Sequence, residues 1–312
     1  MVGEHLAALI DLPESPLSLA ESVALCTRLA RTHYENFTLV SWLVPRRMRP
    51  HVNVLYAFCR TVDDVGDEAP GDRNTLLDRF ESELHAAYGG TPRHPVLVAL
   101  RRTIDEFDLL KEPFLKLIEA NRIDQGKDRY ATFSELLHYC DRSANPVGRL
   151  FLMLFGYHDE ELFALSDATC TALQLVNFWQ DVKRDYEMER IYLPQDEMVR
   201  YKVSEEDLAS NRASEAVKVL MRFQVERTRE YFCAGFPLID RVRGHLKVDI
   251  ALFSRGGLAI LEKIEAQGYD TLAHRPTLEK GEKLRVFLST LLSRRFTSKR
   301  LISKKCALWR KK

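Results

Sequence analysis

Apolar residues recur at intervals of three and four along most of the chain, and this spacing leaves little choice of fold. In an α-helix such a spacing places the apolar side chains on one face. It predicts helices over residues 76–88, 96–107, 113–124, 133–140, 147–155, 160–186, 214–232 and 247–267. Turn-forming sequences separate these segments, and we find no convincing alternation of the period-two kind that marks a β-strand. The sequence therefore predicts an all-α protein.

The length and composition predict one main domain with a basic extension. A chain of 312 residues that is 46% hydrophobic and 29% charged can bury a large core. We expect a helical domain over residues 1–290 and a basic amphipathic tail over residues 291–312. The net charge of +1 conceals this asymmetry, because residues 283–312 carry eleven Lys and Arg and no acidic residue. Apolar residues alternate with these cations, as in segments that lie on anionic membranes; a solvated, frayed terminus is the alternative.

Three absences bear on the cellular location. The N-terminus lacks the basic start and long apolar run of a secretory signal. The longest apolar run, LFLMLFGY at 150–157, is less than half of the roughly 20 residues that a membrane span needs. Six scattered cysteines predict neither a zinc site nor a disulfide framework. We expect a cytoplasmic protein with no nucleic acid partner, peripheral on the inner face of the membrane if the tail binds lipid.

A first acidic stripe lies in the sequence HVNVLYAFCRTVDDVGDE, residues 51–68. Tyr56, Arg60, Asp63 and Asp67 follow one another at steps of four, three and four. On a helix these side chains lie within about 60° of one another and form one polar stripe. The residues expected to pack inward or sideways are Val54, Leu55, Phe58 and Val62.

A second stripe lies in LQLVNFWQDVKRDYEMERIYLP, residues 173–194, where Gln174, Asn177, Asp181 and Asp185 share one helix face. Carboxylates at i and i+4 repel each other, so helix stability does not explain this spacing. A single pair of this kind is usually a solvated face. This one is surrounded by apolar residues, where charge is costly without a counter-charge. These apolar residues are Leu175, Val176, Phe178, Trp179 and Val182.

The two stripes together indicate a metal-diphosphate site. Oxygen ligands without Cys or His select hard cations. Mg²⁺ typically uses one or two carboxylates together with substrate phosphates instead of a full protein cage. The sequence therefore predicts Mg²⁺ as cofactor and a diphosphate as substrate.

The segments CRTVDDVGDE and QLVNFWQDVKRDYEMERIYLP resemble the aspartate-rich motifs of the squalene/phytoene synthase family of prenyltransferases. The likeness covers roughly residues 25–270 and includes HYENF, YCDRSANPVG and RGGLAILEKIE. It implies a single-domain isoprenoid synthase fold in which the two motifs face each other across a deep apolar cavity. By this resemblance, the residues that would hold Mg²⁺ are Asp63, Asp67, Asn177, Asp181 and Asp185.

The resemblance also implies contacts to the prenyl diphosphate itself. Arg60, Gln174 and Arg190 would donate hydrogen bonds to the phosphates or their metal cluster, since a guanidinium fork matches phosphate oxygens. The residues placed in the same region are His33, Tyr34, Asn36, Tyr56 and Tyr192. For Tyr56 and Tyr192, an ordinary half-buried tyrosine is the alternative.

The segment YCDRSANPVG departs from the family's usual Tyr-Cys-aromatic-x-Val-Ala-Gly-x-Val-Gly helix by Asp141, Arg142, Asn145 and Pro146. This variant is similar to the hydroxysqualene-forming branch of the bacterial hopanoid and squalene route. That branch removes diphosphate from presqualene diphosphate and adds water. We expect Asp141, Arg142 and Asn145 to be catalytic residues that hold this water. A local Asp141–Arg142 salt bridge and a Pro146 bend in the helix are the alternative.

Other functions stay open from the sequence. A condensing enzyme would join two molecules of a prenyl diphosphate such as farnesyl diphosphate into presqualene diphosphate, dehydrosqualene or phytoene. A catalytically silent assembly factor would be expected to lose the aspartates, and here both sets are present. In the hydroxysqualene branch we expect functional coupling to the enzyme that supplies presqualene diphosphate and to the reductase that follows.

Overall fold

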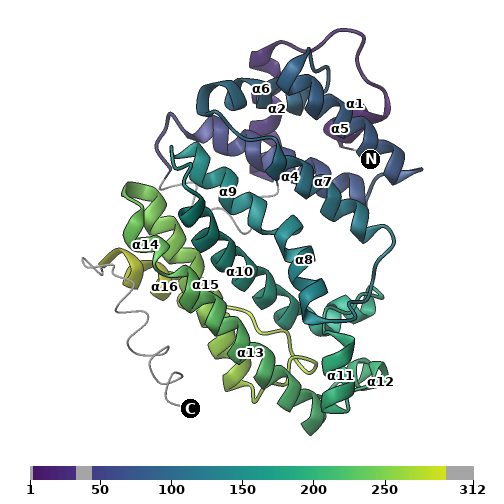
Figure 1. Ribbon diagram of the computed structural model, residues 1–312, viewed down its shortest axis with the longest axis vertical. Coiled ribbons are helices and arrows are strands. Elements are labelled where there is room, and N and C mark those ends of the chain that lie inside the picture. Colours follow the sequence, from purple (N-terminus) through teal and green to yellow (C-terminus); the bar gives the residue numbers. More distant parts are fainter. Residues whose placement is uncertain (1–2, 33–43, 293–312) are drawn as a thin grey trace. The chain divides into compact units, whose positions relative to one another are not determined.

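The computed structural model describes residues 3–32 and 44–292, which are built from α-helices (Figure 1). Within these residues the only β-pairing is an isolated bridge between Arg129 and Ile191. The all-α prediction is therefore confirmed. The chain forms two compact units, the first of residues 1–126 and 149–158 and the second of residues 127–148 and 159–312.

In the first unit, α4 is the central helix and packs against α1, α2, α5, α6 and α7. Pro50 lies in the first turn of α4, where its missing N–H has no intrahelical partner to lose. Phe58 on α4 contacts the rings of Phe80 and Phe114, with centroid distances of 5.3 and 4.8 Å. The helices are α1 (Glu4–Ile10), α2 (Leu19–Thr32), α4 (Arg49–Asp67), α5 (Arg73–Gly89), α6 (Pro95–Phe107) and α7 (Glu112–Asp124).

In the second unit, the 28-residue α10 packs against α8, α12, α13, α14 and α15. Its N-terminus is capped by Asp159, which accepts hydrogen bonds from two backbone N–H groups. Trp179 is fully buried and donates from Nε1 to Thr228 Oγ1 at 2.8 Å. The helices are α8 (Phe133–Ser143), α10 (Glu160–Glu187), α11 (Gln195–Tyr201), α12 (Glu205–Ala209), α13 (Glu215–Gly235), α14 (Leu238–Arg241), α15 (Gly244–Ala266) and α16 (Lys280–Leu292).

The eight helices expected from periodicity are all present, with ends displaced by three residues or fewer. The single helix that the family resemblance implied for YCDRSANPVG is wrong. α8 ends at Ser143 and α9 (Asn145–Leu154) begins two residues later, in agreement with the separate periodic segments 133–140 and 147–155. Pro146 therefore lies in the first turn of a new helix and does not bend an old one.

Two further expectations concern location. None of the helices in the described ranges is both long and apolar enough to cross a membrane. Free thiols are found at Cys26, Cys59, Cys140 and Cys170. Cys233 is disulfide-bonded, which the scattered cysteine spacing did not predict.

Asp249 on α15 is a buried carboxylate, 1% exposed, and neither of its oxygens has a hydrogen-bond partner among the described residues. Burial raises the pKa of Asp249 to about 7, above the roughly 3.9 of an unfolded chain. The folded protein thus keeps this proton to a higher pH than the unfolded protein. Consequently the contribution of Asp249 to the free energy of unfolding falls as pH rises from about 4 to about 7.

Asp249→Asn removes the titrating group, so we expect it to raise the melting temperature at pH 8 by several degrees more than at pH 5. Thermal melts monitored by circular dichroism at the two pH values test this. Glu230→Gln, at an exposed carboxylate of the same unit, is the control and should show no such difference. An Asp249→Asn shift of equal size at both pH values would contradict the assignment.

Candidate functional site on two acidic helices

The first acidic stripe forms on α4 as the spacing predicts. Asp63 and Asp67 are exposed, and Tyr56 and Arg60 are partly buried. Burial raises the pKa of the Tyr56 hydroxyl above its ordinary value. The apolar residues of the opposite stripe, Val54, Leu55, Phe58 and Val62, are all buried. One side of α4 is therefore fixed in the core and leaves the acidic side available to a ligand.

Asp63 is held by α7 through a close approach of the two helices. Asn121 Nδ2 donates to Asp63 Oδ1 at 3.4 Å, and Gln125 Nε2 donates to the Gly66 carbonyl at 3.0 Å. A Cβ atom at Gly66 would lie 2.2 Å from Asn121 Oδ1, so this contact requires glycine.

The charge of Asp63 is incompletely compensated. Desolvation by the surrounding protein raises the pKa of Asp63 to about 7; the Asn121 hydrogen bond opposes this rise and the Asp67 charge adds to it. The residue as a whole is exposed, so solvent is within reach to screen its charge. A bound cation would favour the ionised form of this carboxyl.

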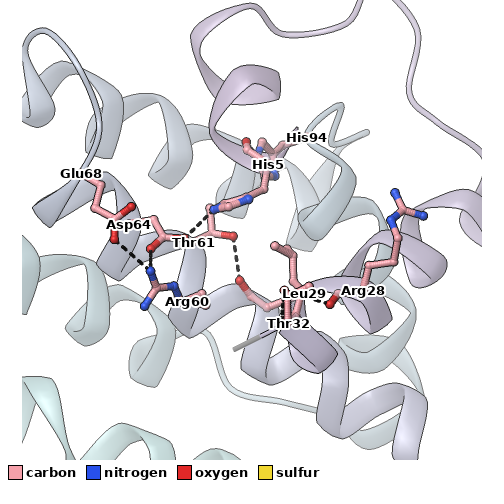
Figure 2. A network of polar contacts seen from close by, with 10 residues as sticks. His5, Arg28, Leu29, Thr32, Arg60, Thr61, Asp64, Glu68 and His94 are labelled. Carbon is pink, nitrogen blue, oxygen red and sulfur yellow. Dashed lines mark hydrogen bonds and ion pairs between the residues drawn. The ribbon is translucent and has the colours of Figure 1, made fainter. Parts of the chain in front are cut away.

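Arg60 belongs to a network that the sequence did not predict (Figure 2). Its Nη2 pairs with Asp64 Oδ1 and lies 3.1 Å from Glu68 Oε1. Asp64 is buried, and its other oxygen lies 2.6 Å from His5 Nε2 on α1. His94 Nε2 in turn lies 3.0 Å from the His5 carbonyl oxygen. Asp64 therefore fixes the Arg60 guanidinium along α4 and ties this helix to α1.

The second stripe forms on α10, again as predicted. Asn177 is exposed, whereas Gln174, Asp181 and Asp185 are half-buried. Desolvation, followed by the nearby Asp181 charge, raises the pKa of Asp185 to about 7. The surrounding apolar residues, Leu175, Val176, Phe178, Trp179 and Val182, are buried. As at Asp63, a partly desolvated carboxyl lies where a cation would favour ionisation.

A counter-charge for this stripe comes from a segment that sequence reasoning missed. Arg275 Nη2 donates to Asp181 Oδ2 at 2.9 Å, and Arg275 Nε donates to the other oxygen. Pro276, the residue after Arg275, is also anchored to α10, because Gln180 Nε2 donates to the Pro276 carbonyl at 2.6 Å. Arg275 lies between α15 and α16 and 94 residues from Asp181, so no helical spacing could have indicated the pair.

The chain reverses directly after α10 and brings Arg190 and Tyr192 back to it. Glu189 has a left-handed φ of 62°, and the Arg190 N–H donates to the Asp185 carbonyl at 2.8 Å. Tyr192 stacks on Phe178, with ring centroids 3.9 Å apart. The rings of Tyr130 and Tyr139 lie 5.6 and 6.0 Å from Tyr192. This packing matches the alternative in which Tyr192 is a half-buried core tyrosine.

The polar segment 141–145 comprises the end of α8 and the start of α9 and lies in the same unit as α10. Asp141 and Arg142 form a local ion pair at 3.3 Å, which is the contact expected of the structural alternative. Asn145 is buried, and its Oδ1 accepts a hydrogen bond from Thr171 Oγ1 of α10 at 3.0 Å. Asn145 thus links the start of α9 to the helix that carries the second stripe.

The donor sets of the two stripes fit Mg²⁺ shared with a diphosphate. Each stripe offers two carboxylates, and the second adds the Asn177 amide. Among the described residues, no three His, Cys, Asp or Glu side chains come together as a complete metal site. Mg²⁺ often relies on few protein ligands plus phosphate oxygens. The facing of the two stripes across a cavity stays a prediction, and His33, Tyr34 and Asn36 lie outside the described residues.

Comparisons with known proteins agree with these features. The family model described as squalene/phytoene synthase matches residues 30–282. A phytoene synthase of Arthrospira platensis is 31% identical, covering 86% of this chain and 92% of its own. A hydroxysqualene synthase of Rhodopseudomonas palustris is 32% identical, covering 82% and 87%. The crystal structure of squalene synthase HpnC from Alicyclobacillus acidocaldarius is similar with a TM-score of 0.78 and 44% identity, covering 85% of this chain and 99% of that one.

Proposed function

The chain belongs to the squalene/phytoene synthase family, whose members process prenyl diphosphates, and on this premise we propose that it is a Mg²⁺-dependent hydroxysqualene synthase. The observation that carries the proposal is the polar segment 141–145, which replaces the family's usual apolar sequence. Asn145 in this segment accepts a hydrogen bond from Thr171 of α10, the helix that carries the second acidic stripe. The 32% identity to a hydroxysqualene synthase supports the same choice.

The proposed reaction converts presqualene diphosphate and water into hydroxysqualene and diphosphate. The carbon–oxygen bond to the diphosphate breaks, and its electron pair leaves with the diphosphate. The remaining cyclopropylcarbinyl cation rearranges, and a water oxygen bonds to it while one proton passes to solvent. No reductant is needed, because the water takes the place that a hydride would otherwise occupy.

The residues of the two stripes receive distinct roles in this proposal. When bound, Mg²⁺ would offset the charge that develops on the departing diphosphate. Its ligands would be Asp63, Asp67, Asn177, Asp181 and Asp185. Arg60, Gln174 and Arg190 would donate hydrogen bonds to the phosphate oxygens.

A second group would position water. The Asp141 carboxylate, paired with Arg142, would accept a hydrogen bond from the attacking water. Asn145 already accepts from Thr171 through its carbonyl oxygen, which leaves its amide N–H groups for donation. Apolar and aromatic walls would keep other water from the cation.

A condensing activity is the second candidate, supported by the 31% identity to a phytoene synthase. Separate incubations of the purified protein and Mg²⁺ with farnesyl diphosphate and with presqualene diphosphate distinguish the two. We expect a hydroxylated C30 alcohol from presqualene diphosphate alone. Ready condensation of farnesyl diphosphate with no turnover of presqualene diphosphate would favour the condensing branch. A protein inert toward both, with Mg²⁺ present, would favour the silent assembly factor.

The double variant Asp141→Phe/Asn145→Gly tests the water-holding role. We expect a smaller hydroxylated fraction and more elimination or alternative products, measured by mass spectrometry, because the cation would lose its positioned water. Thr171→Val is the matched control, since it removes the structural hydrogen bond to Asn145 and keeps both polar groups. If this control shifts the product ratio as far as the double variant does, the segment acts only through packing.

A further inference from the structure

Helix α16 turns a row of leucines toward solvent. Leu284, Leu288 and Leu291 are 55%, 44% and 41% exposed. Their spacing of four and three places them within about 60° of one another on the helix surface. Single exposed leucines are common on proteins, but an aligned row of three forms a continuous apolar face.

The opposite side of α16 is attached to the protein, which fixes the direction of the leucines. Helix α16 packs against α15. Lys263 Nζ on α15 donates to both carboxylate oxygens of Glu282 at 2.7 and 2.6 Å. Arg255 Nη1 donates to Ser289 Oγ at 3.2 Å, and Thr290 is fully buried. Helix α16, which lies beside α15 in Figure 1, therefore holds the leucine row in a fixed orientation on the second unit.

Positive charge lies along both edges of this row. Lys280, Lys283 and Arg285 are exposed, and Lys283 and Arg285 lie about 100° to either side of Leu284. The acidic residue of this helix, Glu282, forms a salt bridge with Lys263. No acidic residue follows it in the sequence. An apolar row edged by cations is the pattern of a helix that lies in the plane of an anionic membrane surface.

We propose that the α16 leucine face, formed by Leu284, Leu288 and Leu291 with Lys280, Lys283 and Arg285, docks on an anionic lipid bilayer. The leucines would enter the boundary between headgroups and acyl chains, and the cations would contact lipid phosphates. Lipid is favoured over a second copy of this chain as the occupant, because two such cationic faces would repel each other. The expectation from sequence placed membrane contact in the tail; the docking surface proposed here begins before it, on a folded helix.

Co-sedimentation of the full chain with lipid vesicles tests this proposal. The vesicles consist of phosphatidylcholine, with or without about 30 mol% phosphatidylglycerol, which gives them an anionic surface potential. We expect binding to the anionic vesicles that weakens in high salt. The triple variant Leu284→Gln/Leu288→Gln/Leu291→Gln should bind about tenfold more weakly or worse. Val199→Gln/Val219→Gln is the matched control, because these residues are 77% and 46% exposed in the same unit and should leave binding unchanged.

Three results would overturn the proposal. The first is a wild-type chain that fails to bind anionic vesicles. The second is a triple variant that binds as tightly as wild type; if that variant also changed its oligomeric state on gel filtration, the row would be an interface between copies. The third is a loss of binding on deletion of residues 293–312, with the leucine row intact, which would assign docking to the tail alone. Turnover of detergent-dispersed substrate should be equal in all these variants, so the test is independent of the proposed function.

Discussion

The Asp181→Asn variant is expected to lose about two to three orders of magnitude in turnover of the prenyl diphosphate while keeping its fold. The carboxylate charge is needed for the metal-diphosphate complex, and asparagine supplies oxygen without charge. Stability should change little. The variant loses the ion pair between Asp181 and Arg275. The Arg275 side chain is 47% exposed, so this ion pair contributes about 1 kcal/mol or less to stability. It also relieves repulsion from Asp185, worth a few tenths of a kcal/mol.

Steady-state kinetics at saturating Mg²⁺, together with thermal melts, check this prediction. Glu187→Gln is the matched control, because Glu187 is exposed on the same helix but outside the stripe; its kinetics should equal those of wild type. Asp63→Asn should reproduce the loss on the first stripe. Turnover within tenfold of wild type, or a melting temperature far below it in both stripe variants, would indicate that these carboxylates are structural.

The second large effect concerns stability. Asp64→Ala is expected to lower the free energy of unfolding by about 3 kcal/mol, because it removes the buried partner of both His5 and Arg60. For a protein of this size that corresponds to a fall in melting temperature of roughly 5 °C or more. Asp64→Asn should recover part of the loss, since its amide oxygen can still accept a hydrogen bond in the same place.

Glu68→Ala is the matched control for this effect. Glu68 pairs with the same Arg60, but its side chain is 63% exposed, so its loss should cost about 0.5 kcal/mol or less. Equal destabilisation by Asp64→Ala and Glu68→Ala would show that burial does not govern this network. Thermal melts of the three variants at one pH are sufficient for the comparison.

The acidic stripes were predictable because they depend on one helix at a time. The steps from Arg60 to Asp63 and from Asn177 to Asp181 determine which side chains share a face, whatever the helix packs against. The buried residues opposite them follow from the same geometry, and the structure places all of them in the core. Local periodicity was sufficient for this part of the site.

The missed features depend on contacts between distant segments or on short elements. Asp64 follows Asp63 directly, yet a step of 100° turns it to the buried side, where it meets His5 of a seven-residue helix. Arg275 reaches Asp181 from an irregular segment. The break between α8 and α9 has a local cause, because Pro146 lacks the N–H that a continuous helix would bond to the carbonyl four residues earlier, and its ring would clash with that carbonyl. The proline signal is present in the sequence, but it does not distinguish a bend from a break.

The central claim, that this enzyme captures water on a cation derived from presqualene diphosphate, is tested most directly in ¹⁸O-labelled water. Purified protein, Mg²⁺ and presqualene diphosphate are incubated without a nicotinamide cofactor, and the product is analysed by mass spectrometry. The proposal predicts a hydroxylated C30 alcohol that carries one ¹⁸O atom from the solvent. A product without the label, or no reaction with presqualene diphosphate alongside ready condensation of farnesyl diphosphate, would contradict it.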